Sequence, residues 1–351
     1  MEFRGRDTHL VRGALATTDV TRFLSAIEEG DPSAKDVRWV CATNWEFLIM
    51  MQGSGADQQL TEELRAFFLA KGADLVGFGS VGLMGGSPDI MRPERYLPGA
   101  RTMISIGLAI NQASCNLIAR SVREHGVPAS YHSYQLFTMT LINPQLDALA
   151  YHGARFLERR GFRAYPFPAN MPHIVTPTEQ YPGGPGDISH RHVAVACGLG
   201  HIGWHTMLLT PEFGTRQKLT SIVTDAPLQP DTIRDERLCD PEACGFQCAQ
   251  ACPTGAIPKR SDDSVSIQIG GKAVEYARLV GWKCRWGCSG MLKCTGGYKD
   301  IPMPKTEPTA EELLRYKAEM DPWQERVKRY SGLTPYCGRC LCICPCGGRN
   351  H

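Results

Sequence analysis

Twelve of the fifteen cysteines lie between residues 239 and 346, where their spacing is typical of a metal site. The segment CDPEACGFQCAQACPTGAIP (239–258) places four cysteines four, three and three residues apart and follows the last with proline. Bacterial ferredoxins hold cubane iron–sulfur clusters with a C-x2-C-x2-C-x3-C-P run. The first two gaps are longer here, but the ending x3-C-P is intact. Structural zinc, which uses paired C-x2-C knuckles separated by a dozen or more residues, is the alternative for these thiols.

A second cysteine set lies near the C-terminus, in YCGRCLCICPCGG (336–348). In two-cluster ferredoxins the fourth cysteine of each run binds the other cluster. This pseudo-symmetry predicts four ligands for the first cluster, namely Cys239, Cys244, Cys248 and Cys344. It predicts only three for the second cluster, namely Cys252, Cys337 and Cys340. The missing ligand is either Cys284 or Cys288, and the sequence does not decide between them.

The remaining thiols have simpler explanations. Cys294, Cys342 and Cys346 are spare thiols, alternative ligands or redox groups. Cys41, Cys115 and Cys197 lie far from the other twelve, and buried cysteine commonly behaves as a small hydrophobic residue. A disulfide framework is not expected, because such frameworks belong to small secreted domains in oxidising compartments.

Length and composition describe an ordinary globular chain. The 351 residues are 42% hydrophobic, which is enough for two or three domains. The 38 basic and 36 acidic side chains nearly cancel, so no overall charge favours nucleic acid. The N-terminus lacks the apolar core of a signal peptide, and no apolar run approaches the roughly 20 residues that span a bilayer. We therefore expect a cytoplasmic chain without a membrane anchor.

Helical and strand patterns alternate through the first two thirds of the chain. Residues 60–81 have apolar residues at helical spacing, then Gly72, then the strand-like ADLVGFG. A buried strand is predicted within 97–110, and a helix followed by Gly161 and a strand within 143–167. The glycine-rich stretch 197–214 leads into a further strand at 217–228. Residues 176–187 have the composition of a loop that rims or covers a site. These alternations predict an α/β (α+β) core.

Several segments in a fixed order resemble a known family. RYLPGARTMISIGLAI is followed by RGFRAYPFPAN, by CGLGHIGWHTMLLTPEFGTRQ with VTDAPL, and then by the two cysteine blocks. This series is similar to the cobalamin-dependent reductases with two [4Fe–4S] clusters, which comprise epoxyqueuosine reductases and reductive dehalogenases, and it covers roughly residues 61–346. The resemblance implies a corrinoid-binding core of nitroreductase type over 61–230 and a ferredoxin-like iron–sulfur domain over 231–351. Residues 1–60 match neither branch and are expected to form an N-terminal extension or cap.

The resemblance also implies the cofactors. The corrinoid is held in the base-off form between the two domains, so the D-x-H-x-x-G signature of base-on proteins, which this chain lacks, is not required. Gly198, Gly200 and Gly203 are expected to let the backbone approach the corrinoid, and His205 to face its tail. A ferredoxin or flavodoxin is the implied electron donor. Its electrons reach the corrinoid through the two [4Fe–4S] clusters.

The resemblance also implies catalytic residues, because the family's catalytic positions match particular residues of this sequence. Asn170 stands where epoxyqueuosine reductases have an acidic proton donor and some dehalogenases have asparagine, and an amide cannot act as a general acid. Tyr131 is therefore expected to donate the proton, with Arg216 lowering its pKa and binding the leaving anion. Nearby alternatives are His132, Tyr134 and His173.

The sequence thus predicts a cobalamin- and iron–sulfur-dependent reductase that resembles the dehalogenases and cleaves a small organic substrate. One alternative is a tRNA-modifying enzyme similar to epoxyqueuosine reductase, although nucleic acid is not the expected partner. Another is an electron-transfer protein that reduces the corrinoid of a partner. The oligomeric state is open, and a homodimer is one option.

Overall fold

The computed structural model describes residues 55–124, 131–169, 186–297, 300–309, 311–312, 315–316 and 337–346. Those after Gly55 belong to one compact unit. Of the predicted N-terminal extension (1–60), residues 1–54 lie outside the described residues. Of the predicted loop (176–187), residues 176–185 do so as well.

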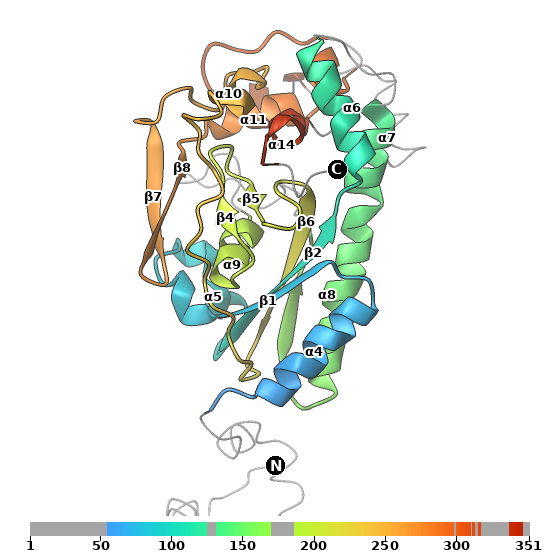
Figure 1. The fold of residues 1–351 in the computed structure, drawn as a ribbon, viewed down its shortest axis with the longest axis vertical. Helices are drawn as coiled ribbons and strands as arrows, with labels where there is room; N and C mark the ends of the chain where they lie inside the picture. The colour runs from blue at the N-terminus through green and yellow to red at the C-terminus, as the bar shows by residue number, and fades with distance from the viewer. Residues whose placement is uncertain are drawn as a thin grey trace, which may run out of the picture. The chain divides into compact units, whose positions relative to one another are not determined.

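A four-stranded antiparallel sheet forms the centre of this unit (Figure 1). Its order is β1 (Leu75–Ser80), β2 (Thr102–Ala109), β6 (Gln217–Thr224) and β3 (Ala164–Phe167). On the central strand β2, Ile104 lies between Phe78 and Ile222, and all three side chains are buried. Because the sheet is covered on both faces, β2 is buried along nearly its whole length rather than on alternate residues.

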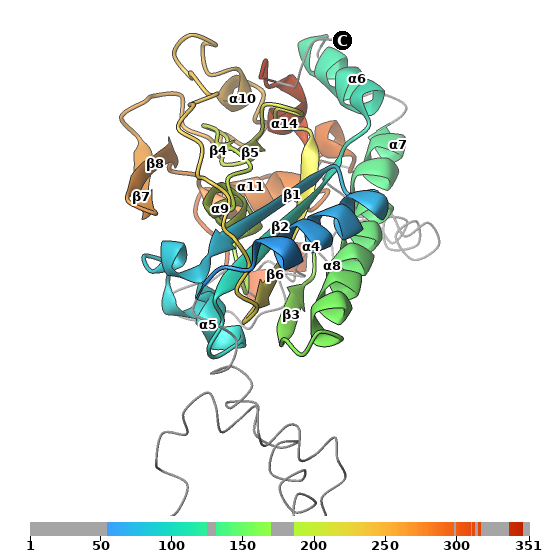
Figure 2. The ribbon, with the colours of Figure 1, turned by 60° about the horizontal axis from the view of Figure 1, so that its bottom comes forward.

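Helices cover the two faces of the sheet (Figure 2). On one face, α4 (Gln58–Ala70) and α8 (Ile142–Glu158) bury Leu64, Phe68 and Leu146 against the sheet. On the other, α9 (His190–Ala196) packs its apolar end into a second core. The unit is therefore of mixed α/β class.

The predicted elements of the sheet and its helices are confirmed. α4 is followed by Gly72 at φ +91° and then by β1. α8 is followed by Gly161 at φ +86° and then by β3. In both places the left-handed backbone, which glycine adopts without steric cost, lets the chain turn back from the helix to the sheet.

A π-helical turn, Leu136–Thr140, joins α7 (Tyr131–Gln135) to α8. Its signature is the bond from the Leu141 N–H to the Leu136 carbonyl at 2.9 Å, which spans five residues.

The cysteine-bearing segments gather at one end of the sheet, around α10 (Gln247–Gln250), α11 (Gly281–Cys288) and α14 (Arg339–Ile343) (Figure 1). There α14 packs against both α10 and α6 (Gln112–Arg123). The two cysteine sets, separated by almost a hundred residues in sequence, thus lie side by side.

Two small hairpins complete the unit: β4 (His201–Ile202) with β5 (Leu208–Leu209), and β7 (Ser264–Ile269) with β8 (Lys272–Ala277). The β7–β8 turn is Gly270–Gly271, with both residues at positive φ, as a tight two-residue hairpin requires. The remaining short elements are α5 (Pro93–Tyr96) and the 3-10 turns Val81–Met84, Asp89–Met91 and Lys293–Thr295. Within the described parts of the chain, no helix is both long and apolar enough to cross a bilayer.

Candidate functional site

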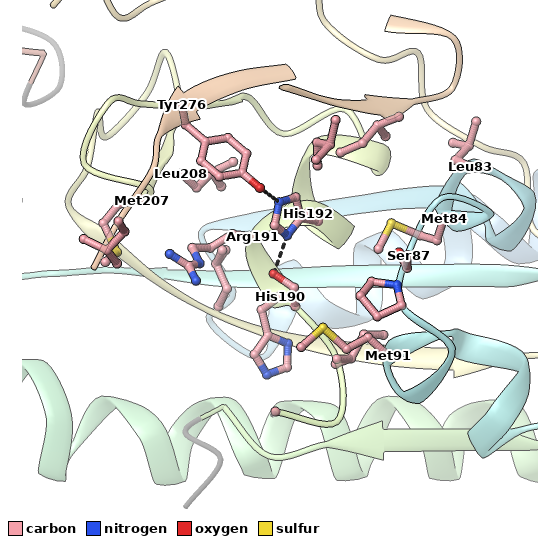
Figure 3. Close-up of a pocket in the computed structure, with 18 of the residues that line it drawn as sticks. Leu83, Met84, Ser87, Met91, His190, Arg191, His192, Met207, Leu208 and Tyr276 are labelled. Carbon is pink, nitrogen blue, oxygen red and sulfur yellow. Dashed lines mark hydrogen bonds between the residues drawn. The ribbon is translucent and has the colours of Figure 1, made fainter. Parts of the chain in front are cut away.

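A cavity of about 690 Å³ lies beside the sheet, between α9, strand β6, the β7–β8 hairpin and the segment before α5 (Figure 3). Its size is in the range of small-molecule and cofactor sites. Apolar side chains make up most of its wall, including three methionines: Met84, Met91 and Met207. Ala169 and Gly186, which flank an undescribed segment, also line it.

The first turn of α9 supplies two histidines to this cavity (Figure 3). His190 Nε2 lies 2.9 Å from the Pro168 carbonyl and its Nδ1 lies 2.8 Å from the Ser221 hydroxyl, so Nε2 donates and Nδ1 accepts. His192 is held between Ser189, at 2.6 Å, and the Tyr276 hydroxyl, at 3.0 Å. Burial lowers the pKa of each histidine to about 4. Both rings are therefore neutral near pH 7.

Two cations complete the polar part of the wall. Arg191 Nη1 donates to the carbonyl and the hydroxyl of Thr206, at 2.6 and 2.9 Å, and so fixes a residue whose φ is +67°. Lys218 Nζ donates to Met139 Sδ at 2.9 Å, and burial lowers the pKa of this ammonium group to about 8. Among the described residues that line the cavity there is no aspartate or glutamate, so its wall carries positive charge.

The four thiols predicted for the first cluster lie together, with one more. Burial raises the pKa of Cys239 and of Cys248, the latter to about 12, and neighbouring cysteines raise both further. The Trp204 N–H donates to Cys239 Sγ at 3.2 Å, as backbone amides commonly do toward cluster sulfurs. The fifth thiol is Cys346, which hydrogen-bonds Cys344. We refer to these residues as the first cysteine group: Cys239, Cys244, Cys248, Cys344 and Cys346.

The thiols predicted for the second cluster also lie together, and both of its candidate fourth ligands are present. Burial raises the pKa of Cys337 and Cys340, and the charge of Cys288 raises them further. The Ala256 N–H donates to Cys252 Sγ at 3.3 Å. We refer to these residues as the second cysteine group: Cys252, Cys284, Cys288, Cys337 and Cys340.

The described residues contain no ready-made site for a single ion. Within the described residues, no three His, Cys, Asp or Glu side chains converge on one ion position. The thiols of each group nevertheless lie close enough together to shift one another's pKa. Of the leftover cysteines, Cys342 hydrogen-bonds Cys115, and Cys294 borders Cys252.

Tyr131 and Arg216 do not line the cavity, and different charged groups surround them. The buried Tyr131 hydroxyl donates to the Cys337 carbonyl. Burial raises its pKa well above 10, opposite to the expected lowering, and its counteracting cation is Arg339 rather than Arg216. Arg216 is buried near Cys115, and its Nε and Nη1 have no hydrogen-bond partner among the described residues.

The alternatives to Tyr131 are placed only in part. Tyr134 hydrogen-bonds Cys342. Asn170 and His173 lie outside the described residues, as does the side chain of His132.

The three glycines expected at the corrinoid lie against protein atoms. A Cβ would lie 2.5 Å from the Thr232 carbonyl oxygen at Gly198, 1.9 Å from that of Leu209 at Gly200, and 2.8 Å from the His205 ring at Gly203. His205 is buried, and burial lowers its pKa to about 4. Its Nδ1 accepts from the Met207 N–H at 3.0 Å, whereas its Nε2 has no partner in the described structure.

Comparison with known proteins places the chain by sequence, although no family model matches it. It is 40% identical over 72 residues to epoxyqueuosine reductase of Listeria monocytogenes serovar 1/2a, covering 20% of this chain and 18% of that protein. It is 25% identical over 224 residues to epoxyqueuosine reductase of Bacillus cereus, covering 57% and 53%. It is 32% identical over 203 residues to tetrachloroethene reductive dehalogenase of Desulfitobacterium hafniense, covering 54% and 33%. The chain is a divergent relative of these reductases.

The sequence resemblance to epoxyqueuosine reductases and reductive dehalogenases is thus confirmed, and both kinds of relative are oxidoreductases by name. The matched segments span about half or less of these relatives' own lengths, at 18%, 53% and 33%.

Two solved structures of this family are similar at lower identity. Epoxyqueuosine reductase with a modified tRNA-Tyr stem loop is 18% identical with a TM-score of 0.43, covering 84% of this chain and 67% of that one. A reductive dehalogenase structure described with a mechanism for B12-dependent dehalogenation is 17% identical with a TM-score of 0.47, covering 83% and 39%. The first of these structures contains a tRNA stem loop.

Sequence reasoning missed the polar residues of the cavity, namely His190, Arg191, His192, Lys218 and Tyr276. A signal was present: S-H-R-H (189–192) opens a short helix with three basic side chains, just before the glycine-rich stretch that carries the family resemblance.

Proposed function

We propose that this relative of the reductases is itself a cobalamin- and iron–sulfur-dependent reductase that cleaves a bond of its substrate reductively. The observation that carries the proposal is the wall shared by the cavity and the second cysteine group. Cys284 lines the cavity and also hydrogen-bonds Cys288 within the group. Electrons held at this group would therefore be one side chain away from a ligand in the cavity.

The residues present fit these cofactors. Each cysteine group offers at least the four thiols that a [4Fe–4S] cluster takes. The largely apolar cavity wall with a few polar groups, among them Lys218 and Arg191, is the lining expected of a cofactor site. The residues that would hold a corrinoid are those of the cavity wall on α9, β6 and the β7–β8 hairpin. A bound corrinoid supplies a strongly reducing, nucleophilic metal centre, and the clusters supply single electrons at low potential.

The side chains of the cavity would handle protons and charge. Lys218 Nζ, whose pKa burial lowers to about 8, is a suitable general acid near neutral pH. Lys218 and Arg191 stabilise negative charge that develops on a leaving group, because the cavity wall is largely apolar and the described lining has no carboxylate. His190 and His192 stay neutral and orient the wall. The apolar side chains exclude water from the reaction.

We propose that Tyr131 and Arg216 support this chemistry from outside the cavity wall. Tyr131 experiences the charge of Cys342, and Arg216 acts on Cys115, which is hydrogen-bonded to Cys342. Asn170, at the position where the family carries either an acidic proton donor or asparagine, remains a proposed catalytic residue. In the same proposal, residues 61–230 form a core of nitroreductase type, and residues 231–351 form a ferredoxin-like domain with two [4Fe–4S] clusters.

The relatives name two substrate classes, and the substrate of this chain is a proposal in either case. A dehalogenase would take a small organohalide and release halide, whereas an epoxyqueuosine reductase would take an epoxide on a tRNA nucleoside. The positively charged cavity is compatible with a released halide. Halide release from tetrachloroethene and conversion of an epoxyqueuosine tRNA stem loop, assayed in parallel with reduced ferredoxin or flavodoxin, separate the two classes.

The decisive test of the cofactors is the metal content of protein purified without oxygen and reconstituted with cobalamin. We expect about eight irons, about eight sulfides and about one cobalt per chain, the content of two [4Fe–4S] clusters and one corrinoid. Iron and sulfide without retained cobalt would favour an electron-transfer protein that reduces a partner's corrinoid. Zinc in place of iron would contradict both functions.

A further inference from the structure

The β4–β5 turn, residues 203–207, reaches from the cavity to the first cysteine group. At one end of the turn, Met207 lines the cavity. Near the other end, the Trp204 N–H donates to Cys239 Sγ at 3.2 Å. Trp204 is buried, so water does not compete for this N–H. A single short segment therefore contacts both the proposed substrate site and a predicted ligand of the first cluster.

The turn has an unusual backbone conformation at Thr206. The Thr206 N–H donates to the Gly203 carbonyl, and the Gly203 N–H donates to the Met207 carbonyl, both at 2.8 Å. Within this closed turn Thr206 has a φ of +67°, and the only other described non-glycine residue with a positive φ is Phe246. A β-branched residue rarely adopts this region, and it stays there only where its surroundings hold it.

Arg191 of α9 holds Thr206 in this conformation from the cavity wall. Its Nη1 donates to both the carbonyl and the hydroxyl of Thr206, at 2.6 and 2.9 Å. Thr206 is buried, so water cannot readily replace these bonds. The indole ring of Trp204 is anchored separately, because its Nε1 donates to the Pro258 carbonyl at 2.9 Å and its ring packs against Phe246. The direction of the Trp204 N–H, by contrast, depends on the backbone of the turn.

We propose that Arg191 is a positioning residue for the first cluster. It holds Thr206 in the left-handed conformation, and the turn closed in this way directs the Trp204 N–H at the Cys239 sulfur. The proposal rests on the proposed iron–sulfur function, in which Cys239 is a ligand. A hydrogen bond to a ligand sulfur stabilises the more negative, reduced cluster and so raises its reduction potential. Arg191 thus sets this potential from the cavity wall, through the backbone of the turn.

Pulsed electron paramagnetic resonance tests the N–H···S hydrogen bond. Wild-type protein with ¹⁵N-labelled tryptophan is reconstituted with iron and sulfide and reduced without oxygen. We expect a ¹⁵N coupling to a cluster that disappears in Trp204→Phe, because the backbone nitrogen of that residue is then unlabelled. Arg191→Met should weaken the same coupling. An iron-loaded wild type without it would overturn the inference and leave the proposed function intact, whereas a chain without iron would overturn the proposed function itself.

A redox titration measures the consequence for the cluster. Arg191→Met should lower the potential of one cluster and leave the other unchanged. Thr206→Gly should keep both wild-type potentials, since glycine adopts a positive φ without steric cost. In the double variant, Arg191→Met with Thr206→Gly, the lowered potential should return toward the wild-type value although the positive charge is still absent. Thr206→Ala, which keeps the charge and the strained φ but loses the hydroxyl bond, should lower the same potential by a smaller amount.

The matched control is Arg234→Met, which also removes one positive charge and one hydrogen bond to a backbone carbonyl. Arg234 Nε donates to the Gly198 carbonyl at 2.9 Å, and Arg234 does not line the cavity. Both potentials should keep their wild-type values in this variant. An equally low potential in Arg191→Met and in the double variant, or an equal shift in Arg234→Met, would mean that charge rather than the turn sets the potential, and the positioning role would be wrong. Unchanged potentials in both Arg191→Met and Thr206→Ala would contradict it as well.

Discussion

Lys218 is a cation in an apolar wall, and its protonation is set by two opposing effects. Burial removes water from the ammonium group and lowers its pKa, whereas the neighbouring thiols Cys288, Cys115 and Cys342 raise it. Burial is the larger effect, so the pKa is about 8 rather than 10.5. The side chain can therefore release a proton near neutral pH and still carry charge there.

The first prediction concerns this proton. Activity should fall as the pH rises through about 8, because the folded protein then loses the Lys218 proton. Lys218→Met should lower the turnover number about 10²–10⁴-fold, the usual contribution of a general acid. Lys218→Arg should restore little of this activity, because guanidinium stays protonated and cannot donate the proton. The measurement is the rate of substrate reduction against pH without oxygen.

The pH profile also distinguishes proton donation from a purely electrostatic role. A Lys218→Arg enzyme with full activity across the whole range would indicate that charge alone is required. Identical profiles for wild type and Lys218→Met would remove Lys218 from the mechanism.

At this scale the sequence predicted the cysteines better than the cavity. Cysteine spacing reflects direct ligand geometry, so the members of the two cysteine groups other than Cys346 could be named from order alone, and their role as ligands stays a prediction. Lys218 and Arg191 have no such spacing rule. Their role depends on burial, which brings β6 and α9 together from different parts of the sequence. The local pattern also could not show that Tyr131 faces the Cys337 carbonyl instead of a cation.

At the scale of elements, the β4–β5 hairpin packs closely on the chain before it. A Cβ at Gly200 would lie 1.9 Å from the Leu209 carbonyl oxygen, so no side chain fits without moving backbone. The second prediction is that Gly200→Ala lowers the free energy of unfolding by about 1–3 kcal/mol, the usual cost of overpacking. Chemical denaturation of the apoprotein measures it.

The matched control is Gly281→Ala, at the first residue of α11. A Cβ at Gly281 meets no atom within 4 Å, and this residue does not have a positive φ. We expect little change or a slight stabilisation there. Equal destabilisation by both substitutions would show that the close approach at Gly200 is not what limits the side chain.

Helices and strands could be predicted where the apolar residues followed a single helical or strand spacing. The helix at 60–70 and the strand after Gly72 follow from apolar spacing and a single glycine. The β7–β8 hairpin was not predicted, although VSIQIGGKAVEYA (265–277) alternates apolar and polar residues around a Gly-Gly pair. The antiparallel pairing of β2 with β6 joins segments over a hundred residues apart, and no local pattern encodes it.

At the scale of the molecule, buried neutral histidines make stability depend on pH. Burial lowers the pKa of His190, His192 and His205 from 6.5 to about 4. Between these pH values the unfolded chain binds more protons than the folded chain, so stability rises with pH. The third prediction is that the free energy of unfolding of the apoprotein decreases as the pH falls from about 6.5 toward 4. His192→Gln should make this decrease smaller.

Equilibrium unfolding at several pH values between 4 and 7.5 tests this, with wild type and His192→Gln compared under the same conditions. The same slope in both proteins would mean that His192 takes up its proton without a cost in stability.

The fourth prediction concerns the iron. Each cysteine group joins a segment near residue 250 to one near residue 340, so a bound cluster closes a long loop of chain. Removing the iron with a chelator should lower the melting temperature, because a ligand that binds only the folded state stabilises it. It should also open the cysteine-bearing end to proteolysis while the central sheet is retained. A melting temperature that is unchanged without iron would contradict this coupling.

The π-helical turn at Leu136–Thr140 acts as a phase shift within one long helix. An α-helix advances about 100° per residue, so the one extra residue in this turn rotates everything before it relative to α8. In this arrangement the apolar side of α8 packs on the sheet. The hydroxyl of Tyr131 contacts Cys337, and that of Tyr134 contacts Cys342. Deleting a single residue from the turn would keep the helix and its composition but turn both tyrosines away. The angular offset between the two halves of this helix thus lets one half contact the sheet and the other half contact the cysteine-bearing end.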